Sequence, residues 1–291
     1  MALQRWTFTV DASDAGLRLD QLIAARTGLS RRQAREVLQV GGVQVERKRV
    51  RVASKFIKPG HEVRVAHDPD LPKPPDIEVP IVFEDAWLLA VDKPADIPTQ
   101  GTWASDQHDL QAMLRKQRPD LKLFLHHRLD QGTSGLLVFA KDAAANPGLT
   151  KQFTEGGVRK SYLARTSEPL APCTVDKPVG RIRHADPGRF GCEGDLIDPR
   201  AAQTDFEAVP EGALATLEAG HWILAKPRTG RTHQIRVHLA NLDRPILGDR
   251  LYGGAASDRL WLHAWRLSLA HPVTGAPLEL EAPPARFRRP A

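Results

Sequence analysis

The sequence predicts an α+β protein with a small basic N-terminal domain and a larger, nearly neutral domain. The first observation behind this prediction is charge, because residues 17–65 hold twelve lysines and arginines against four acids, while the rest of the chain holds 29 against 31. The second is periodicity, since helical spacing near the N-terminus gives way to short apolar segments typical of strands. A chain of 291 residues is long enough for one or two such domains.

The first predicted element is a helix over residues 17–28. Leu19, Leu22 and Ile23 recur at helical spacing. Gly28 follows as a typical helix end, since glycine readily adopts the left-handed conformation found there.

A second helix and a strand complete the basic segment. Ser30 precedes residues 31–39, with Gln33 three positions later, which is a capping-box pattern, and the glycine pair at 41 and 42 ends the helix. Residues 43–52 alternate as a strand whose outer face is nearly all cationic. Charge of this kind favours a polyanionic partner, although a merely solvated face uses the same residues.

The boundary between the domains is predicted from proline. Residues 67–80 contain five prolines, which stiffen the chain and block helix formation. We therefore expect a basic domain over residues 1–67, a linker over 68–80 and a larger domain over 81–291.

The larger domain is expected to alternate strands, helices and loops. A tight turn at Asp85 and Ala86 joins its first two strands, and residues 135–141 form a strand buried on both faces. The other expected elements are a helix over 109–119, a strand over 160–165, a long irregular loop over 180–199, a strand over 221–227 and a helix over 232–242.

Cysteine content and hydropathy limit the class of protein. Cys173 and Cys192 form no metal-binding or disulfide pattern, which fits a reducing compartment. The N-terminus lacks the apolar core of a signal peptide, and no apolar run has the length of a membrane span. We expect a soluble, cytoplasmic protein.

The segment HHRLDQGTSGLLVFAKD carries the strongest functional pattern, because it places Asp130 in a polar loop directly before a buried strand. It resembles the RluA-type pseudouridine synthases, whose signature HRLDxxTSGLL matches residues 127–137 without a gap. Similarity continues through KSYLAR, AKPRTGRTHQIRVHLANLDRPILGDRLYGG and LWLHAWRLSLAHPVTG, so that it covers about residues 81–275. One departure is VDKPADIPTQ, where many relatives have glycine and then histidine, and this leaves substrate choice open.

The resemblance implies a fold and a reaction. The fold is a mixed, mainly antiparallel sheet flanked by helices and loops, and the reaction detaches uracil from ribose, turns it over and rejoins it through carbon, with no cofactor. Asp130 corresponds to the nucleophile, which attacks either the sugar or the uracil ring. Tyr162 corresponds to the group against the base, as proton acceptor or stacking platform. A turn-capping aspartate and a core tyrosine are the alternatives.

The resemblance also assigns supporting residues. Arg231, at the start of a helix capped by Thr232, would pair with Asp130 and keep it charged and oriented. Arg128 would fill the gap left by a flipped uridine, or contact a phosphate. His127 would orient the Asp130 loop, and Thr133 and Thr232 are further candidates for substrate contact.

The basic segment resembles the small RNA-binding domain named after ribosomal small-subunit protein four. In that family the second helix and the adjoining strands form the RNA surface. The candidate phosphate contacts are Arg31, Arg32, Arg35, Arg47, Lys48 and Arg49.

Together these patterns predict an RNA pseudouridine synthase with RNA as its partner, most simply large-subunit ribosomal RNA, with transfer RNA the main alternative. A non-catalytic ribosome assembly factor and an RNA glycosidase with paired carboxylates are the competing functions. Histidines 126, 127, 233 and 238 lack the spacing and acidic or thiol partners of a metal site, so no metal is expected. A monomer is the default oligomeric state.

Overall fold

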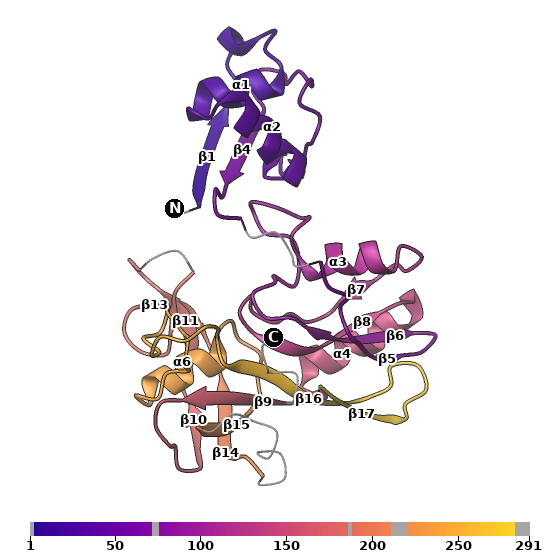
Figure 1. Cartoon of the computed structure of the whole chain (residues 1–291), viewed down its shortest axis with the longest axis vertical. Coiled ribbons are helices and arrows are strands. Elements are labelled where there is room, and N and C mark those ends of the chain that lie inside the picture. Colours follow the sequence, from indigo (N-terminus) through magenta and orange to yellow (C-terminus); the bar gives the residue numbers. More distant parts are fainter. Residues whose placement is uncertain (1–2, 72–75, 186–187, 211–219, 283–291) are drawn as a thin grey trace. The chain divides into compact units, whose positions relative to one another are not determined.

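The computed structural model describes residues 3–71, 76–185, 188–210 and 220–282, and its contacts divide the chain into two units (Figure 1). The first unit is Met1–Glu78 with Ile97–Pro119, and the second is Val79–Asp96 with Asp120–Ala291. Part of the expected linker, residues 72–75, lies outside the described residues. The chain thus leaves the second unit after its first two strands and returns 23 residues later.

The first unit is built on an antiparallel sheet with the order β1-β4-β2-β3. Its strands are β1 (Gln4–Thr9), β2 (Val43–Val45), β3 (Lys48–Arg49) and β4 (Glu62–His67). Its helices are η1 (Ala12–Asp14), α1 (Leu19–Thr27), α2 (Arg31–Val40) and α3 (Leu110–Gln117). Apolar side chains from α1, α2 and the sheet form one buried core.

The helix ends of the first unit follow from local sequence. Gly28 ends α1 in the left-handed conformation, with φ 75°. Ser30 accepts a hydrogen bond from the Gln33 backbone N–H at 3.2 Å, so the predicted cap of α2 is confirmed.

The single strand predicted over residues 43–52 is wrong. Glu46 and Arg47 have φ of 50° and 61° and form a two-residue turn between β2 and β3, with Val45 opposite Lys48. The alternation of apolar and basic residues continues through the turn, which hides it in the sequence.

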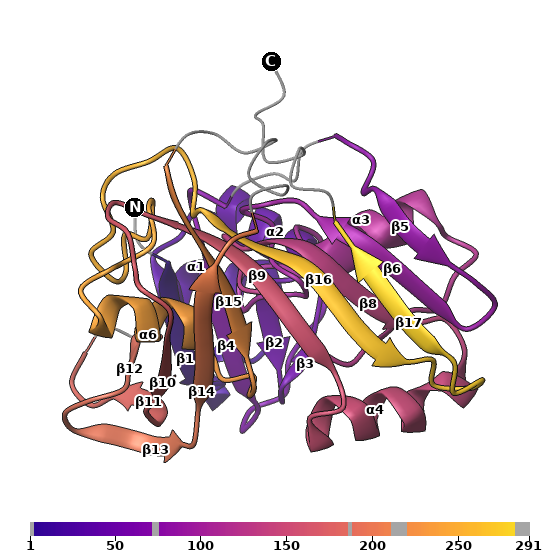
Figure 2. The same ribbon diagram turned by 90° about the horizontal axis from the view of Figure 1, so that it is seen from below.

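The second unit contains a ten-stranded sheet in which β8 and β16 pair in parallel while the other pairings are antiparallel. Its main order is β10-β14-β15-β9-β16-β8-β6-β5, with β17 on β16 and β7 on β8. Figure 2 shows β15, β9, β16, β8, β6 and β5 side by side in this order. The predicted mixed, mainly antiparallel sheet is therefore confirmed.

The elements of this unit have the following bounds. The strands of the sheet are β5 (Ile81–Glu84), β6 (Leu88–Lys93), β7 (Phe124–Leu125), β8 (Ser134–Ala140), β9 (Arg159–Thr166), β10 (Cys173–Asp176), β14 (Gln203–Ala208), β15 (His221–Pro227), β16 (Leu262–Ala270) and β17 (Pro277–Glu281). The helices within the described residues of this unit are η2 (Ala143–Ala145), α4 (Asn146–Glu155) and α6 (Gln234–Asn241).

The long irregular loop predicted over residues 180–199 is replaced by a small sheet with the order β12-β11-β13. Its strands are β11 (Val179–Ile182), β12 (Phe190–Gly191) and β13 (Leu196–Arg200). Glycine, proline and aspartate dominate the segment, and these residues favour turns whether or not the intervening residues pair. The pairing itself is not visible in the local sequence.

Gly135 lets two strands meet beneath the loop that carries Asp130. It has φ 109°, and a Cβ atom there would lie 2.3 Å from the backbone oxygen of Ala264 on β16. Every residue of β8 is buried, as predicted. The Asp130 loop therefore ends at a closely packed part of the sheet. Among the described residues, no helix is long and apolar enough to cross a membrane.

Candidate active site

A cavity of about 500 Å³ in the second unit collects the predicted site residues. All seven proposed catalytic and substrate-contacting residues line it, namely His127, Arg128, Asp130, Thr133, Tyr162, Arg231 and Thr232. They come from the loop before β8, from β9 and from the turn between β15 and α6. Segments that are a hundred residues apart in sequence thus enclose one space.

Two hydrogen bonds fix the backbone around Asp130. Its carbonyl oxygen accepts a hydrogen bond from the Thr133 N–H at 3.1 Å. The ammonium group of Lys93, which is fully buried, donates to the carbonyl oxygen of Gln131 at 3.1 Å. Burial lowers the pKa of Lys93 to about 7, against the opposing charges of Asp96 and Asp130. The Asp130 carboxylate remains 20% exposed toward the cavity it lines.

Arg236, on α6, is the cation beside the Asp130 carboxylate. Its Nη1 lies 3.5 Å from Asp130 Oδ2. Its Nε and Nη2 donate to the two carboxylate oxygens of Asp249 at 2.7 and 2.8 Å. Burial alone would lower the pKa of Arg236, but its hydrogen bonds to the Asp249 carboxylate raise it. A two-pronged pair of this kind fixes the guanidinium plane and points one edge at Asp130.

The expected pairing of Arg231 with Asp130 is not found. Arg231 lines the cavity, but its Nε donates to the carbonyl oxygen of Ala201 at 3.0 Å. The expected helix cap by Thr232 is also wrong, because Thr232 is exposed and His233 is the first flanking residue of α6. The backbone turns at His233, with φ 57°, and this turn separates Arg231 from the helix that carries Arg236.

His233 and Tyr252 complete the support of the carboxylate. His233 Nε2 lies 3.8 Å from Asp130 Oδ2, and its Nδ1 is hydrogen-bonded to the Tyr252 hydroxyl at 2.8 Å. Burial lowers the pKa of His233 despite the charge of Asp130. The imidazole is then neutral at neutral pH, so it positions the group instead of pairing with it as an ion. The Tyr252 ring lies 5.0 Å from the Arg236 guanidinium carbon.

Tyr162 lies on β9, opposite Ala264 of β16. Burial and the charge of Asp130 raise the pKa of Tyr162 above its ordinary value. Its phenol is therefore protonated near neutral pH, which favours stacking or hydrogen-bond donation over proton acceptance. Lys160, two residues earlier, also lines the cavity, and burial lowers its pKa.

His127 packs behind the Asp130 loop. Its Nε2 accepts a hydrogen bond from the Val138 N–H at 3.0 Å, and its ring stacks on Phe153 at 4.4 Å between centroids. Burial lowers the pKa of His127 to about 3, so it stays neutral. Arg128 next to it is exposed at the cavity. The buried Thr133 hydroxyl has no hydrogen-bond partner among the described residues, which leaves it for a ligand or water.

The residues that line the cavity carry more positive than negative charge. Asp130 is the one carboxylate among its lining residues, within the part of the chain that the structure describes. Five cations line it as well: Arg128, Lys160, Arg228, Arg231 and Arg236. A polyanionic substrate fits this balance, and a reaction that uses two carboxylates in the cavity does not.

Arg236, Asp249, His233 and Tyr252 were not singled out from the sequence. Arg236 lies inside a helix whose neighbours Ile235 and Val237 are buried. A charge at such a position requires a partner, and this signal could have pointed to Arg236. Nothing in the local sequence identifies Asp249 as that partner.

The predicted RNA contacts of the first unit differ in their environment. Arg35 and Arg31 lie 2.8 and 3.6 Å from the fully buried carboxylate of Asp20. Arg32 pairs with Glu36 at 2.9 Å. Arg49 donates to backbone carbonyl oxygens inside the unit. Arg47 and Lys48 are exposed in and beside the hairpin turn.

The four histidines considered as metal ligands have separate partners. His126 Nε2 is hydrogen-bonded to Asn146 at 2.9 Å, and His238 is buried against Thr204 at 3.0 Å. No group of three or more metal-ligating side chains occurs within residues 3–71, 76–185, 188–210 and 220–282.

Comparison with known proteins places the chain in a family. The family model described as RNA pseudouridylate synthase matches residues 87–241, and the S4 domain matches residues 17–63. The matched ranges contain the cavity residues from His127 to Arg236 and the basic helices, respectively.

Individual relatives agree with these matches. The chain is 33% identical to ribosomal large subunit pseudouridine synthase D of Vibrio parahaemolyticus, over 95% of this chain and 90% of that protein. It is 35% identical to tRNA pseudouridine synthase C of Salmonella typhi, over 69% of this chain and 84% of that protein. The solved structure of human RNA pseudouridylate synthase domain containing 1 matches with a TM-score of 0.61 and 30% identity, over 72% of this chain and 86% of that one. The chain therefore belongs to the RluA-type RNA pseudouridine synthases, isomerases that act on RNA, and carries an N-terminal S4 domain.

Proposed function

We propose that this enzyme converts uridine to pseudouridine in large-subunit ribosomal RNA, with Asp130 as the nucleophile. The observation that carries the nucleophile assignment is that Asp130 is the single carboxylate lining the cavity, among the described residues. The Asp130 carboxylate attacks the bound base or sugar while Arg236 and His233 hold its Oδ2 atom in place.

The proposed chemistry uses the chain's own residues. Asp130 attacks the anomeric carbon or the uracil ring, the bond from nitrogen to sugar breaks, the base turns over and a carbon–carbon bond forms. The bond to Asp130 breaks again as the product forms, carbon 5 loses its proton and the freed ring nitrogen gains one, so no atoms or electrons are gained overall and no cofactor is needed. Tyr162 provides the platform for the rotating base, with its hydroxyl protonated.

Uridine must leave the RNA stack to reach the carboxylate, and we propose that Arg128 takes its place. Unstacking a base costs a few kcal/mol, roughly. Arg128 is exposed at the cavity and lies two residues from Asp130, so its planar guanidinium can occupy the vacated position.

Ribosomal RNA is favoured by the extent of the matches. Relatives named ribosomal large subunit pseudouridine synthases align with 94–95% of this chain, including most of the N-terminal unit. The relative named tRNA pseudouridine synthase C aligns with only 69% of it. Its slightly higher identity keeps transfer RNA as the second candidate substrate.

Two free cysteines, Cys173 and Cys192, support a cytoplasmic site of action, and we propose that the enzyme acts there as a monomer.

Asp130→Asn tests the nucleophile. The amide cannot form the covalent intermediate, so release of tritium from RNA labelled at carbon 5 of uridine should fall to background while RNA binding is retained. Asp198→Asn, which neutralises an exposed carboxylate outside this cavity, is the matched control and should be active. Full activity of the Asp130 variant would refute the assignment, and free uracil as the product of the wild-type enzyme would indicate a glycosidase.

The substrate is tested by mapping pseudouridines in cells with and without the gene. We expect loss of one or more sites in large-subunit ribosomal RNA. Loss confined to transfer RNA would replace the first candidate with the second.

A further inference from the structure

The first unit carries an exposed aromatic side chain that the catalytic mechanism does not use. Trp103 is 46% exposed and belongs to the segment Ile97–Pro119, which interrupts the second unit in sequence but belongs to the first by its contacts. Tryptophan is highly buried on average, so a ring that is nearly half exposed on a basic RNA-binding unit is a candidate contact for a ligand.

Two arginines from the sheet lie against the Trp103 ring. The guanidinium carbon of Arg5, on β1, is 5.5 Å from the ring centroid, and that of Arg64, on β4, is 5.8 Å away. The register explains why both reach it. Arg5 is opposite Ala66 and Thr7 is opposite Arg64, so the two arginines are diagonal neighbours on one face of the β1–β4 pair.

The opposite face of the same strand pair is occupied by the core of the unit. Trp6 and Phe8 of β1 and Val63 and Val65 of β4 pack there. The face with Arg5 and Arg64 is therefore the outer one. Glu62 accepts a hydrogen bond from Arg64 Nε at 2.5 Å, which orients that guanidinium and offsets part of its charge. Arg5 has no such acidic partner among the described residues.

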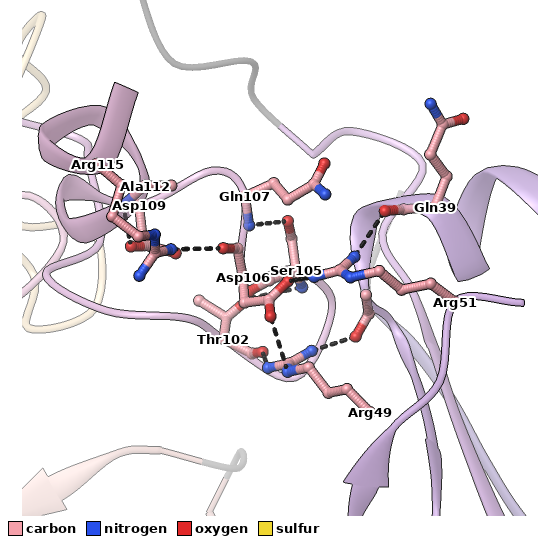
Figure 3. A network of polar contacts seen from close by, with 11 residues as sticks. Gln39, Arg49, Arg51, Thr102, Ser105, Asp106, Gln107, Asp109, Ala112 and Arg115 are labelled. Atoms are coloured by element: carbon pink, nitrogen blue, oxygen red, sulfur yellow. Dashed lines mark hydrogen bonds and ion pairs between the residues drawn. The ribbon is translucent and has the colours of Figure 1, made fainter. Parts of the chain in front are cut away.

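The loop that presents Trp103 is tied down on both sides of it (Figure 3). Arg49 donates to the carbonyl oxygens of Gly41 and Thr102, the latter at 2.5 Å. Arg51 pairs with the carboxylate of Asp106. Arg49, predicted from the sequence as a phosphate contact, thus fastens the loop instead.

Backbone contacts and small residues add to this anchoring. The Asp106 N–H donates to the carbonyl oxygen of Val40 at 3.2 Å. Gly42 permits the close approach, because a Cβ atom there would lie 2.9 Å from the backbone oxygen of Ala104. Trp103 is consequently held in place before any ligand arrives, and a fixed aromatic ring loses little entropy on binding.

We propose that Trp103, flanked by Arg5 and Arg64, is a stacking site for one unpaired nucleobase of the RNA substrate, outside the catalytic cavity. An aromatic ring beside arginines is the combination by which proteins bind single-stranded nucleic acid, because the ring stacks on the base while the cations attract the adjacent phosphate. The net charge of residues 17–65 supplies the attraction that brings RNA to this unit. This site rests on RNA as the substrate but not on Asp130 as the nucleophile.

The test is an equilibrium binding titration of the full-length protein with a fluorescent single-stranded RNA oligonucleotide and with a blunt duplex of the same sequence. Trp103→Ala should weaken single-strand binding by about five- to hundredfold, the range found when a stacking residue is removed. Trp103→Phe, which keeps a ring, should stay within about threefold of wild type. Duplex binding should change far less, since only the two end pairs of a blunt duplex expose a base face.

Two further variants separate stacking from charge and from general loss of apolar surface. Arg5→Gln should reduce the slope of log affinity against log salt by about 0.7, while Trp103→Ala leaves that slope unchanged. Phe56→Ala removes a ring of the same unit that is 63% exposed and lies over no cation among the described residues, and it should have no effect.

Either of two results would overturn the proposal: wild-type affinity of Trp103→Ala for the single strand, or an equal loss for the duplex. The nucleophile is judged separately, since tritium release by Asp130→Asn does not depend on the outcome of these titrations.

Discussion

Replacement of Arg236 by lysine tests whether its fork geometry, and not only its charge, is required. Arg236 contacts two carboxylates at once, with Nε and Nη2 on Asp249 and Nη1 at 3.5 Å from Asp130. A lysine ammonium is a compact charge on a flexible stem and cannot reproduce three directed contacts in one plane. It can remain on Asp249 or move to Asp130.

The size of the effect follows from these contacts. Loss of one charge-assisted hydrogen bond to the buried Asp249 should lower the free energy of unfolding by about 1.5–3 kcal/mol. For a unit of this size that corresponds to a fall in Tm of about 3–12 °C. Displacement of the Asp130 carboxylate by an ångström should reduce kcat by about a hundredfold, because attack requires a near-aligned geometry.

The assay is single-turnover tritium release at saturating RNA, combined with a thermal melt of each variant. Arg231→Lys is the matched control, since Arg231 lines the same cavity but its Nε binds the Ala201 carbonyl oxygen. We expect its rate at saturation to stay within a few-fold of wild type. The reasoning would be refuted if Arg231→Lys lost the hundredfold and Arg236→Lys did not.

Three other perturbations follow from the packing and charge of the described residues. Gly135→Ala should lower the free energy of unfolding by about 1–3 kcal/mol or more in denaturant titration, because its Cβ would lie 2.3 Å from the Ala264 backbone oxygen; wild-type stability would contradict the close approach. Burial lowers the pKa of His263 from 6.5 to about 3, so the unfolded chain binds a proton that the folded one does not, and the free energy of unfolding should fall by about 1.4 kcal/mol per unit as pH drops below 6.5. His127, whose pKa burial also lowers to about 3, contributes in the same direction, so His263→Gln should reduce the slope in acid titrations by about 1.4 kcal/mol per unit without abolishing it, and an unaltered slope would exclude His263 as a source. Asp20→Asn should weaken RNA binding about tenfold although it removes a negative charge, because each arginine it releases has about 0.5–1.5 kcal/mol more side-chain entropy to lose. Glu36→Gln makes the same charge change on an exposed pair and should bind RNA at least as well as wild type; tighter binding by both variants would show that only net charge matters.

Local signals in the sequence predicted the parts of the fold that local interactions determine. The capping box at Ser30 and the glycine at position 28 define helix ends within a few residues of themselves, and both predictions are confirmed. The strand over β8 was predicted from its unbroken apolar run, which needs no knowledge of its partners.

The predictions were wrong where contacts between residues distant in sequence determine the structure. Strands β11 to β13 exist because they pair with each other, and their turn-rich composition does not reveal this. The turn at Glu46 and Arg47 lacks the asparagine–glycine pair that usually marks such hairpins. Which arginine reaches Asp130 depends on the left-handed backbone at His233, a conformation that histidine adopts only occasionally.

The candidate site shows the same division. The cavity residues were identified through the signature around Asp130 and two later segments of the family resemblance, and the structure brings all seven into one cavity. Asp249, which holds Arg236, follows α6 in the chain by several residues; it lies in the second segment of the family resemblance, but no pattern of charge or spacing singles it out. Its part in the site became visible only from the folded geometry.

Residues 97–119 interrupt the second unit in sequence but belong to the first, and this determines where the chain can be truncated. Three covalent connections join the two units, after Glu78, after Asp96 and after Pro119. Deleting the N-terminal 78 residues would therefore leave a catalytic fragment that still carries Trp103 and Asp106, but without the arginines that bind their loop. A clean excision must also replace residues 97–119 with a short connection, and a truncation at the proline-rich segment alone should yield a fragment that is prone to proteolysis within that loop.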